Sequence, residues 1–184
     1  MNPASSRRTF LAAGLALPAQ AAAPAAAPKL EFRKLGKTGL EVTSLGFGCM
    51  LASDAIVLER AADTGINYFD TARIYQGGNN ERMVGAALKS RRKGVLIGTK
   101  THAGTRCAAL EELETSLREL GTDYIDIWYL HAKSRPSQIT DELLEALAAA
   151  RKQGKVRFAG VSTHSNQTGL IPALASNPQI DVIL

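Results

Sequence analysis

The chain has 184 residues, of which 45% are hydrophobic and 21% are charged, a composition typical of soluble globular proteins. Its formal net charge is +5, and removing Arg7 and Arg8, which lie in an acid-free N-terminal segment, leaves 5 − 2 = +3. This charge is too small to indicate a nucleic-acid-binding or membrane-surface protein, and the few aromatic residues argue against base stacking. No apolar run of about 18 residues predicts a membrane span in the mature chain.

Residues 1–28 are predicted to be a leader and not part of the fold. The segment 6–11 (Ser-Arg-Arg-Thr-Phe-Leu) resembles a twin-arginine export signal, an apolar run follows to residue 17, and Ala19-Gln20-Ala21 fits a cleavage site. The simpler alternative is a disordered Ala/Pro-rich tail, which residues 21–28 would form in either case. The export prediction implies the twin-arginine machinery as a partner and a periplasmic or secreted mature domain over 29–184.

The first elements after the leader are predicted to be short. Residues 30–42 predict a hairpin around a glycine-containing turn, and 42–47 predict the first strand of a larger sheet. Ser53 or Asp54 is placed to cap a helix that runs to about Thr64, with Ile56, Ala61 and Ala62 facing inward.

A regular alternation of strands and helices follows. The strand 66–69 ends at Asp70, and Asn80 is placed to cap a helix that carries Glu81 in its first turn. Thr105 begins an amphipathic helix that Gly121 ends, and its inward-facing leucines are Leu110, Leu113, Leu117 and Leu120. Further strands are predicted at 95–100, 125–131, 158–162 and 180–184, and further helices at 140–153 and 167–176.

This alternation predicts an α/β fold in which helices cover a parallel sheet. About six strands are present, whereas a closed eight-stranded (β/α)8 TIM-barrel type fold needs about 250 residues, so the prediction is an incomplete barrel. An open doubly wound sheet is the alternative. It usually has a glycine-rich turn after its first strand, and Gly46-Phe47-Gly48 has no such continuation.

Polar residues stand at the ends of successive predicted strands. Asp70, Lys100, His131 and Ser162 each close a strand, and Tyr75 follows Asp70 on a loop. Taken singly, an aspartate after a strand is a common turn former and a loop tyrosine is a common packing residue. However, parallel strands bring their carboxyl ends to one rim, so these side chains are predicted to converge.

Such a group of residues suits proton transfer to a carbonyl oxygen. A free tyrosine titrates near pH ~10, and a neighbouring ammonium lowers the pKa of a phenol. Lys100 could supply that charge, Asp70 could hold the lysine, and His131 could donate a hydrogen bond to the substrate oxygen. Because no side chain delivers hydride, a nicotinamide cofactor is implied.

These motifs resemble the aldo-keto reductase superfamily from Leu30 to Leu184. The matching segments are 65–72 with Tyr75, Glu81 and Gly85; Thr99-Lys100; Leu117 with 120–126; Leu130-His131; 154–157; and 160–162. The resemblance implies a (β/α)8 barrel that reduces aldehydes and ketones with NAD(P)H, with NADP as the expected cofactor and NAD as the alternative. A small-molecule carbonyl or alcohol substrate is therefore predicted.

The resemblance also assigns roles to individual residues. The catalytic tetrad falls on Asp70, Tyr75, Lys100 and His131, with Tyr75 as the general acid. The cofactor contacts fall on Gly48, Cys49, Met50, Asp70, Ser162 and Thr163. The sequence departs from the family where Thr163-His164 replaces a common asparagine and where Gln76 replaces the glycine usual after the tyrosine. The seventh and eighth strands, with the loops that hold the adenosine phosphate, are absent from it.

Two functions follow from these observations. The first is an exported NAD(P)H-dependent oxidoreductase that reduces a carbonyl compound or oxidises an alcohol or sugar. The second is a truncated, non-catalytic half-barrel, a fragment or a protein that binds a partner through an open sheet edge.

Several other residues are interpreted more simply. Cys49 and Cys107 are predicted to be unpaired thiols, and no spacing typical of metal ligands is present. Trp128 is predicted to be in the core, and His102 to be a solvated loop histidine. The run 91–93 (Arg-Arg-Lys) is predicted to be a solvated helix end.

Overall fold

The computed structural model describes residues 30–184, so the predicted leader lies outside the described residues. The first elements are β1 (Phe32–Lys34) and β2 (Glu41–Thr43), which pair antiparallel with Phe32 opposite Thr43. Gly39, between them, adopts the left-handed backbone conformation that glycine accepts without strain. The predicted hairpin is therefore confirmed.

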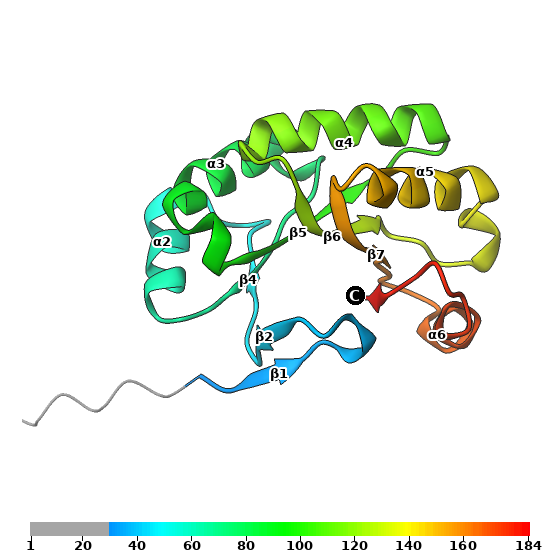
Figure 1. The fold of residues 1–184 in the computed structure, drawn as a ribbon, viewed down its shortest axis with the longest axis horizontal. Helices are drawn as coiled ribbons and strands as arrows, with labels where there is room; N and C mark the ends of the chain where they lie inside the picture. The colour runs from blue at the N-terminus through cyan, green and yellow to red at the C-terminus, as the bar shows by residue number, and fades with distance from the viewer. Residues whose placement is uncertain (1–29) are drawn as a thin grey trace, which may run out of the picture.

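The main sheet has six parallel strands in sequential order. They are β3 (Phe47–Gly48), β4 (Tyr68–Asp70), β5 (Leu96–Thr101), β6 (Ile125–Leu130), β7 (Val156–Val161) and β8 (Val182–Ile183). Figure 1 shows the strands curling around a common interior with the helices outside. A doubly wound sheet would reverse its strand order at a switch point, whereas this order never reverses, so the barrel-type prediction is confirmed.

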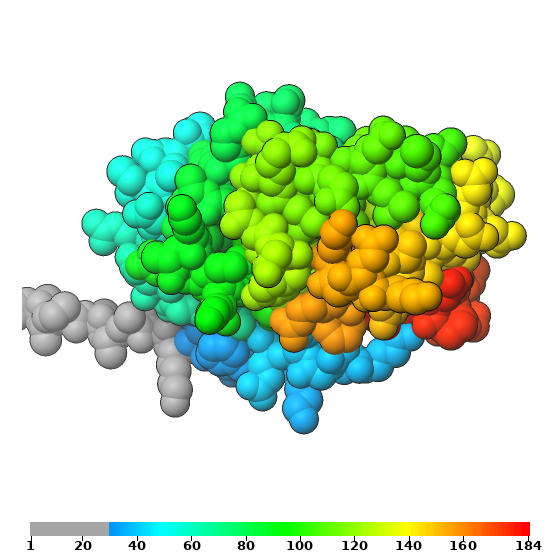
Figure 2. All heavy atoms as spheres, turned by 45° about the horizontal axis from the view of Figure 1, so that its top comes forward, coloured from blue at the N-terminus to red at the C-terminus, as the bar shows by residue number. Residues whose placement is uncertain are grey.

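Five helices connect the strands. They are α2 (Ala55–Asp63), α3 (Asn79–Leu88), α4 (Arg106–Leu120), α5 (Asp141–Lys152) and α6 (Gln167–Ala175). Asp54 caps α2 by accepting from the Ile56 amide at 2.9 Å, and Thr105 and Thr140 cap α4 and α5 in the same way. Figure 2 shows α4 and α5 side by side on the outside of the molecule, with the hairpin emerging below them. No helix of residues 30–184 is long and apolar enough to cross a membrane.

Three details differ from the sequence predictions. Val42 pairs with Arg33 in the hairpin, so the first strand of the main sheet is only the short β3. Ile56 was expected to face inward but is 59% exposed, because Leu58 and Ala61 present the buried face of α2.

The third difference concerns the start of α3. Gly78, not Asn80, stands at the N-cap position. The buried Asn80 side chain instead accepts from the Thr71 hydroxyl at 2.6 Å and donates to the Cys49 carbonyl at 2.8 Å. These two bonds join the ends of β3 and β4 to the first turn of α3, which a simple cap would not do.

Apolar packing occurs on both faces of the sheet. The outer core, between sheet and helices, contains Trp128, which is 1% exposed as predicted. The inner core lies between the sheet and the hairpin and includes Leu40, Tyr129 and Val182. The Tyr129 hydroxyl is 2.8 Å from that of Tyr68, so each of these two hydroxyl groups has a hydrogen-bond partner within an apolar interior.

The contact between α3 and α4 depends on Gly85. A Cβ atom there would lie 2.4 Å from the Leu120 carbonyl oxygen and 2.7 Å from the Leu120 Cα atom. Because these are backbone atoms, neither can move aside as a side chain could.

Gly85→Ala is therefore expected to lower the free energy of unfolding by about 1–3 kcal/mol or more, as overpacked cores do. The gain in helix propensity, about 1 kcal/mol, only partly offsets this loss. Urea denaturation measures it. Gly94→Ala is the matched control, since nothing lies within 4 Å of a Cβ atom at that position. Equal stability of the two variants would contradict the prediction.

Candidate active site

The polar residues at the strand ends lie on one face of the sheet. Side chains two residues apart in a strand point the same way. Asp70 therefore points in the same direction as Tyr68, and His131 in the same direction as Tyr129, toward the interior of the curled sheet. The tyrosine pair fills this interior one layer below, so Asp70 and His131 form the next layer at the carboxyl rim.

Lys100 is the centre of this layer. Its side chain is 2% exposed, and its ammonium donates to Asp70 Oδ2 at 2.5 Å, to the Thr71 carbonyl at 2.7 Å and to the Tyr75 hydroxyl at 3.4 Å. All three ammonium hydrogens thus have acceptors. The predicted approach of Asp70, Tyr75 and Lys100 is seen in the structure.

Tyr75 begins a 3-10 turn (Tyr75–Gly78) directly above the lysine. Its ring lies 5.0 Å from the Lys100 ammonium and 5.7 Å from the His131 ring, which it meets edge-on at 76°. The phenol thus lies between a cation and an imidazole. The four residues predicted as a tetrad are therefore neighbours in space.

Gln76 shapes this turn in a way the sequence did not reveal. Its φ angle is +52°, a left-handed conformation uncommon for residues other than glycine. Its side-chain amide donates to the carbonyls of Met50, at 3.1 Å, and Ala52, at 2.7 Å. These bonds offset the backbone strain and tie the tyrosine turn to the loop after β3.

A buried ion pair supports the turn from behind. Glu81 is fully buried on α3, pairs with Arg73 and accepts from the Thr99 hydroxyl at 2.5 Å. Burial raises the pKa of Glu81, which these partners counteract. Arg73 thereby fixes the loop that carries Tyr75 to α3 and β5.

His131 has an environment that keeps it neutral. It is 5% exposed, and burial, followed by the charges of His102 and Lys100, lowers the pKa of His131 to about 4. The His102 ring lies 4.2 Å from the His131 ring. His102 is exposed, as predicted for a loop histidine, but its position two residues after Lys100 places it against the site.

A neutral His131 has a measurable consequence. Its NMR ring signals should stay unchanged between about pH 5.5 and 8, where a free histidine, with a pKa near 6.5, would titrate. The His131→Asn spectrum identifies the signals. As the pH is lowered, His131 binds its proton in the unfolded chain at a higher pH than in the folded chain. The free energy of unfolding should therefore decrease as the pH falls from about 6.5 toward 4. A midpoint near 6.5 in the folded protein would contradict the prediction.

The residues predicted to contact the cofactor differ in their exposure to solvent and in their hydrogen bonds. Ser162 is 2% exposed, and its hydroxyl oxygen accepts from the Ala132 amide at 2.9 Å, which leaves its hydrogen to donate. The Thr163 hydroxyl donates to the Ser165 carbonyl at 2.8 Å. Gly48 and Met50 are exposed, but the Cys49 side chain is wholly enclosed, and burial raises the pKa of its thiol to about 12.

Two buried polar atoms of the site have no hydrogen-bond partner within residues 30–184. They are Asp70 Oδ1 and His131 Nδ1. Buried polar atoms in proteins are almost always paired, so such a pair in the tetrad fits a site that binds a ligand with hydroxyl or amide groups. The nicotinamide riboside part of a dinucleotide has both kinds of group.

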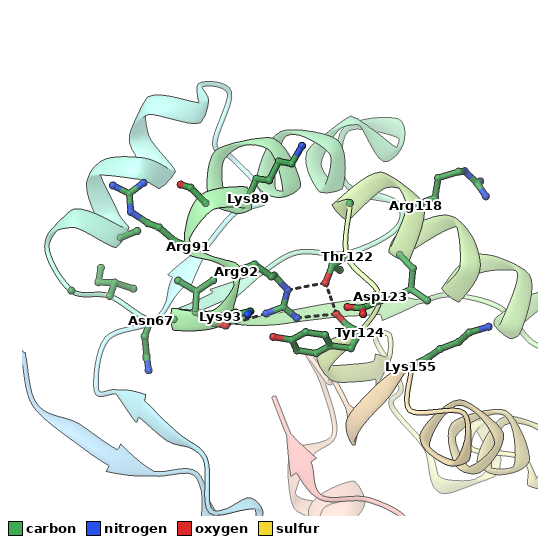
Figure 3. A pocket seen from close by; sticks show the side chains of 18 of the residues that line it. Asn67, Lys89, Arg91, Arg92, Lys93, Arg118, Thr122, Asp123, Tyr124 and Lys155 are labelled. Atoms are coloured by element: carbon green, nitrogen blue, oxygen red, sulfur yellow. Dashed lines mark hydrogen bonds between the residues drawn. The ribbon is translucent and has the colours of Figure 1, made fainter.

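A depression of the described chain lies at the opposite end of the sheet, lined by the segments that precede β5 and β6. It has a volume of about 1300 Å³, and Figure 3 shows Arg92 at its centre with Lys89, Arg118 and Lys155 at the rim. Arg92 is partly buried and pairs with Asp126 at 2.8 Å, so the prediction of a solvated run at 91–93 is wrong for this residue. Its guanidinium also donates to the Val95 and Tyr124 carbonyls, so these contacts hold together the segments before β5 and β6.

Comparison with known proteins decides the family. The sequence model of the Aldo/keto reductase family matches residues 50–177. The chain belongs to the aldo/keto reductase family. This aldo/keto reductase chain is 35% identical over 150 residues to an uncharacterized oxidoreductase, YqkF, of Bacillus subtilis, covering 71% of the chain and 48% of the relative. It is 33% identical over 161 residues to L-galactose dehydrogenase of Arabidopsis thaliana, covering 73% and 49%.

Solved structures show the same fold. The holo form of aldo-keto reductase AKR11C1 from Bacillus halodurans superimposes with a TM-score of 0.74 at 34% identity, over 84% of this chain and 57% of that one. The thermostable aldo-keto reductase Tm1743, in complex with the inhibitor epalrestat, gives a TM-score of 0.72 at 31% identity, over 83% and 61%. The chain spans about half the length of the curated relatives it matches.

Proposed function

We propose that this chain carries the acid–base site of an NAD(P)H-dependent oxidoreductase that reduces an aldehyde or ketone, or oxidises the corresponding alcohol. NADP is the proposed cofactor and NAD the alternative. The observation that supports this most is the contact of a buried ammonium with both a carboxylate and a phenol, Lys100 with Asp70 and Tyr75. Family membership supports the same reaction class.

Each side chain has a defined task in this proposal. Asp70 holds the Lys100 ammonium in place, and the ammonium stabilises negative charge on the phenol oxygen of Tyr75 as its proton leaves. Neutral His131 donates a hydrogen bond to the carbonyl oxygen and sets the position of the substrate. Tyr75 then protonates that oxygen.

The nicotinamide cofactor would supply hydride to the carbonyl carbon. Asp70 Oδ1 and the Ser162 hydroxyl are the proposed contacts for its ribose and carboxamide, and Gly48, Met50 and Thr163 lie along the same rim. These residues would orient the cofactor's reactive face toward the substrate held by Tyr75 and His131.

The direct test uses the purified chain. We expect NADPH titration to change its intrinsic fluorescence, and a simple aldehyde to consume the bound NADPH in a single turnover. Size-exclusion chromatography run alongside should show a monodisperse species. A monodisperse chain that neither binds NADPH nor reduces any aldehyde would instead support the non-catalytic half-barrel.

We also propose that residues 1–28 direct export of a mature domain, 29–184, through the twin-arginine machinery. In this case Arg7→Lys/Arg8→Lys should retain the unprocessed chain in the cytoplasm of a bacterial host. Cell fractionation and the mass of the mature N-terminus measure the result. Unchanged export of the double variant would contradict the proposal.

A further inference from the structure

The loop after β6 brings a second lysine to the rim. The Lys133 amide donates to the Ser162 carbonyl at 2.8 Å, which fixes this residue beside a proposed cofactor contact. Its side chain is half-buried, and burial lowers the pKa of Lys133. None of the ion pairs within residues 30–184 includes it. A half-buried ammonium with no carboxylate partner there has lost hydration without receiving a counter-charge.

The surrounding groups do not supply that counter-charge. The positive charges of Lys100 and Lys133 both lower the pKa of His131. Two carboxylates on β4 and α4 have other partners: Asp70 is paired with Lys100. Glu112 is occupied by the Thr101 hydroxyl, at 2.5 Å, and the His102 amide, at 3.2 Å. Asp70 neutralises Lys100, so beside His131 it is the ammonium of Lys133 that has no carboxylate partner within residues 30–184.

We propose, resting on the oxidoreductase function above, that the substrate is a carbonyl compound bearing a carboxylate, and that Lys133 binds this carboxylate while Tyr75 and His131 hold the carbonyl oxygen. Lys133 is thus a specificity-determining residue. It selects acidic substrates because its ammonium gains a counter-ion only from them. The other possible source of an anion for Lys133 is a phosphate of the cofactor, which the experiment separates.

The experiment compares terephthalaldehydic acid with its methyl ester, which share the reacting aldehyde and differ in charge. The wild-type chain should show a kcat/KM about tenfold or more higher for the acid, the range of a charge-assisted hydrogen bond. Lys133→Gln should lower the value for the acid to that for the ester and leave the ester unchanged, and Lys133→Arg should restore the preference. Lys152→Gln, on the exposed last turn of α5, is the matched control and should behave as wild type.

The possible failures are distinct. Equal kcat/KM for acid and ester in the wild type overturns this inference, while turnover of the ester still supports the reductase function. Weaker NADPH binding by Lys133→Gln with an unchanged acid-to-ester ratio assigns the lysine to the cofactor phosphate and likewise overturns it. If neither aldehyde reacts, the reductase function fails. Calorimetric titration then decides the binding claim, which falls if wild type and Lys133→Gln bind the acid equally.

Discussion

Replacing Tyr75 by phenylalanine is expected to slow carbonyl reduction by about 100- to 10,000-fold, the contribution of a positioned general acid. The phenol is placed to act as the acid because its oxygen lies 3.4 Å from the Lys100 ammonium, which stabilises the phenolate. Phenylalanine keeps the ring in its edge-on contact with His131 and removes the hydroxyl group, with the proton it donates and the oxygen that accepts from Lys100. Folding should therefore be unchanged.

Stopped-flow decay of bound NADPH measures this effect, and urea denaturation checks the fold. Tyr124→Phe is the matched control, because Tyr124 lies at the opposite end of the sheet, where its ring packs 3.9 Å from Arg92. It should retain wild-type turnover. Wild-type turnover in Tyr75→Phe would refute its role as the acid.

Lys100→Met is expected to have the largest effect on stability, in addition to reducing turnover. It removes one partner of a buried ion pair and leaves the Asp70 carboxylate without a counter-charge, which typically destabilises a protein by about 3–5 kcal/mol. Methionine preserves most of the side-chain volume, so the loss reports charge more than packing. Urea denaturation at low temperature keeps the weakened chain measurable.

The pH dependence of this loss has a defined sign. Burial already raises the pKa of Asp70 in the wild type, although Lys100 pulls it down. Without the lysine the rise is unopposed, whereas the unfolded value stays near 3.9. The loss of stability in the variant should thus be largest at neutral pH and become smaller as the pH falls and the folded carboxyl group takes up its proton. Lys100→Met/Asp70→Asn should recover part of the stability at neutral pH, and a pH-independent deficit would contradict the charge explanation.

The strand ends explain why much of the site was predictable. Asp70, Lys100 and His131 each close a buried apolar run, and parallel strands bring such ends to one rim. Their meeting therefore follows from patterns within short windows of sequence. The helix that begins after Thr105 was equally clear, since a threonine cap and a C-terminal glycine bound the leucine stripe of α4.

The missed features depend on loops and on competing apolar residues. Three consecutive apolar residues, 56–58, made the inward face of α2 ambiguous, and only packing selects Leu58. The bonds of Gln76 to the loop after β3, and the contact of His102 with His131, join segments whose spacing says nothing about their meeting. Arg92 was assigned to solvent because its partner, Asp126, lies 34 residues away on a strand.

The contrast between the two cysteines has a practical consequence for anyone who studies this molecule. Cys107 stands exposed at the start of α4, whereas Cys49 is fully enclosed and holds its proton tightly. A maleimide dye added to the native chain should therefore attach at one place only, without mutagenesis. This ready-made label would allow single-molecule or energy-transfer measurements on the unmodified sequence, with denaturant-exposed Cys49 as a built-in reporter of unfolding.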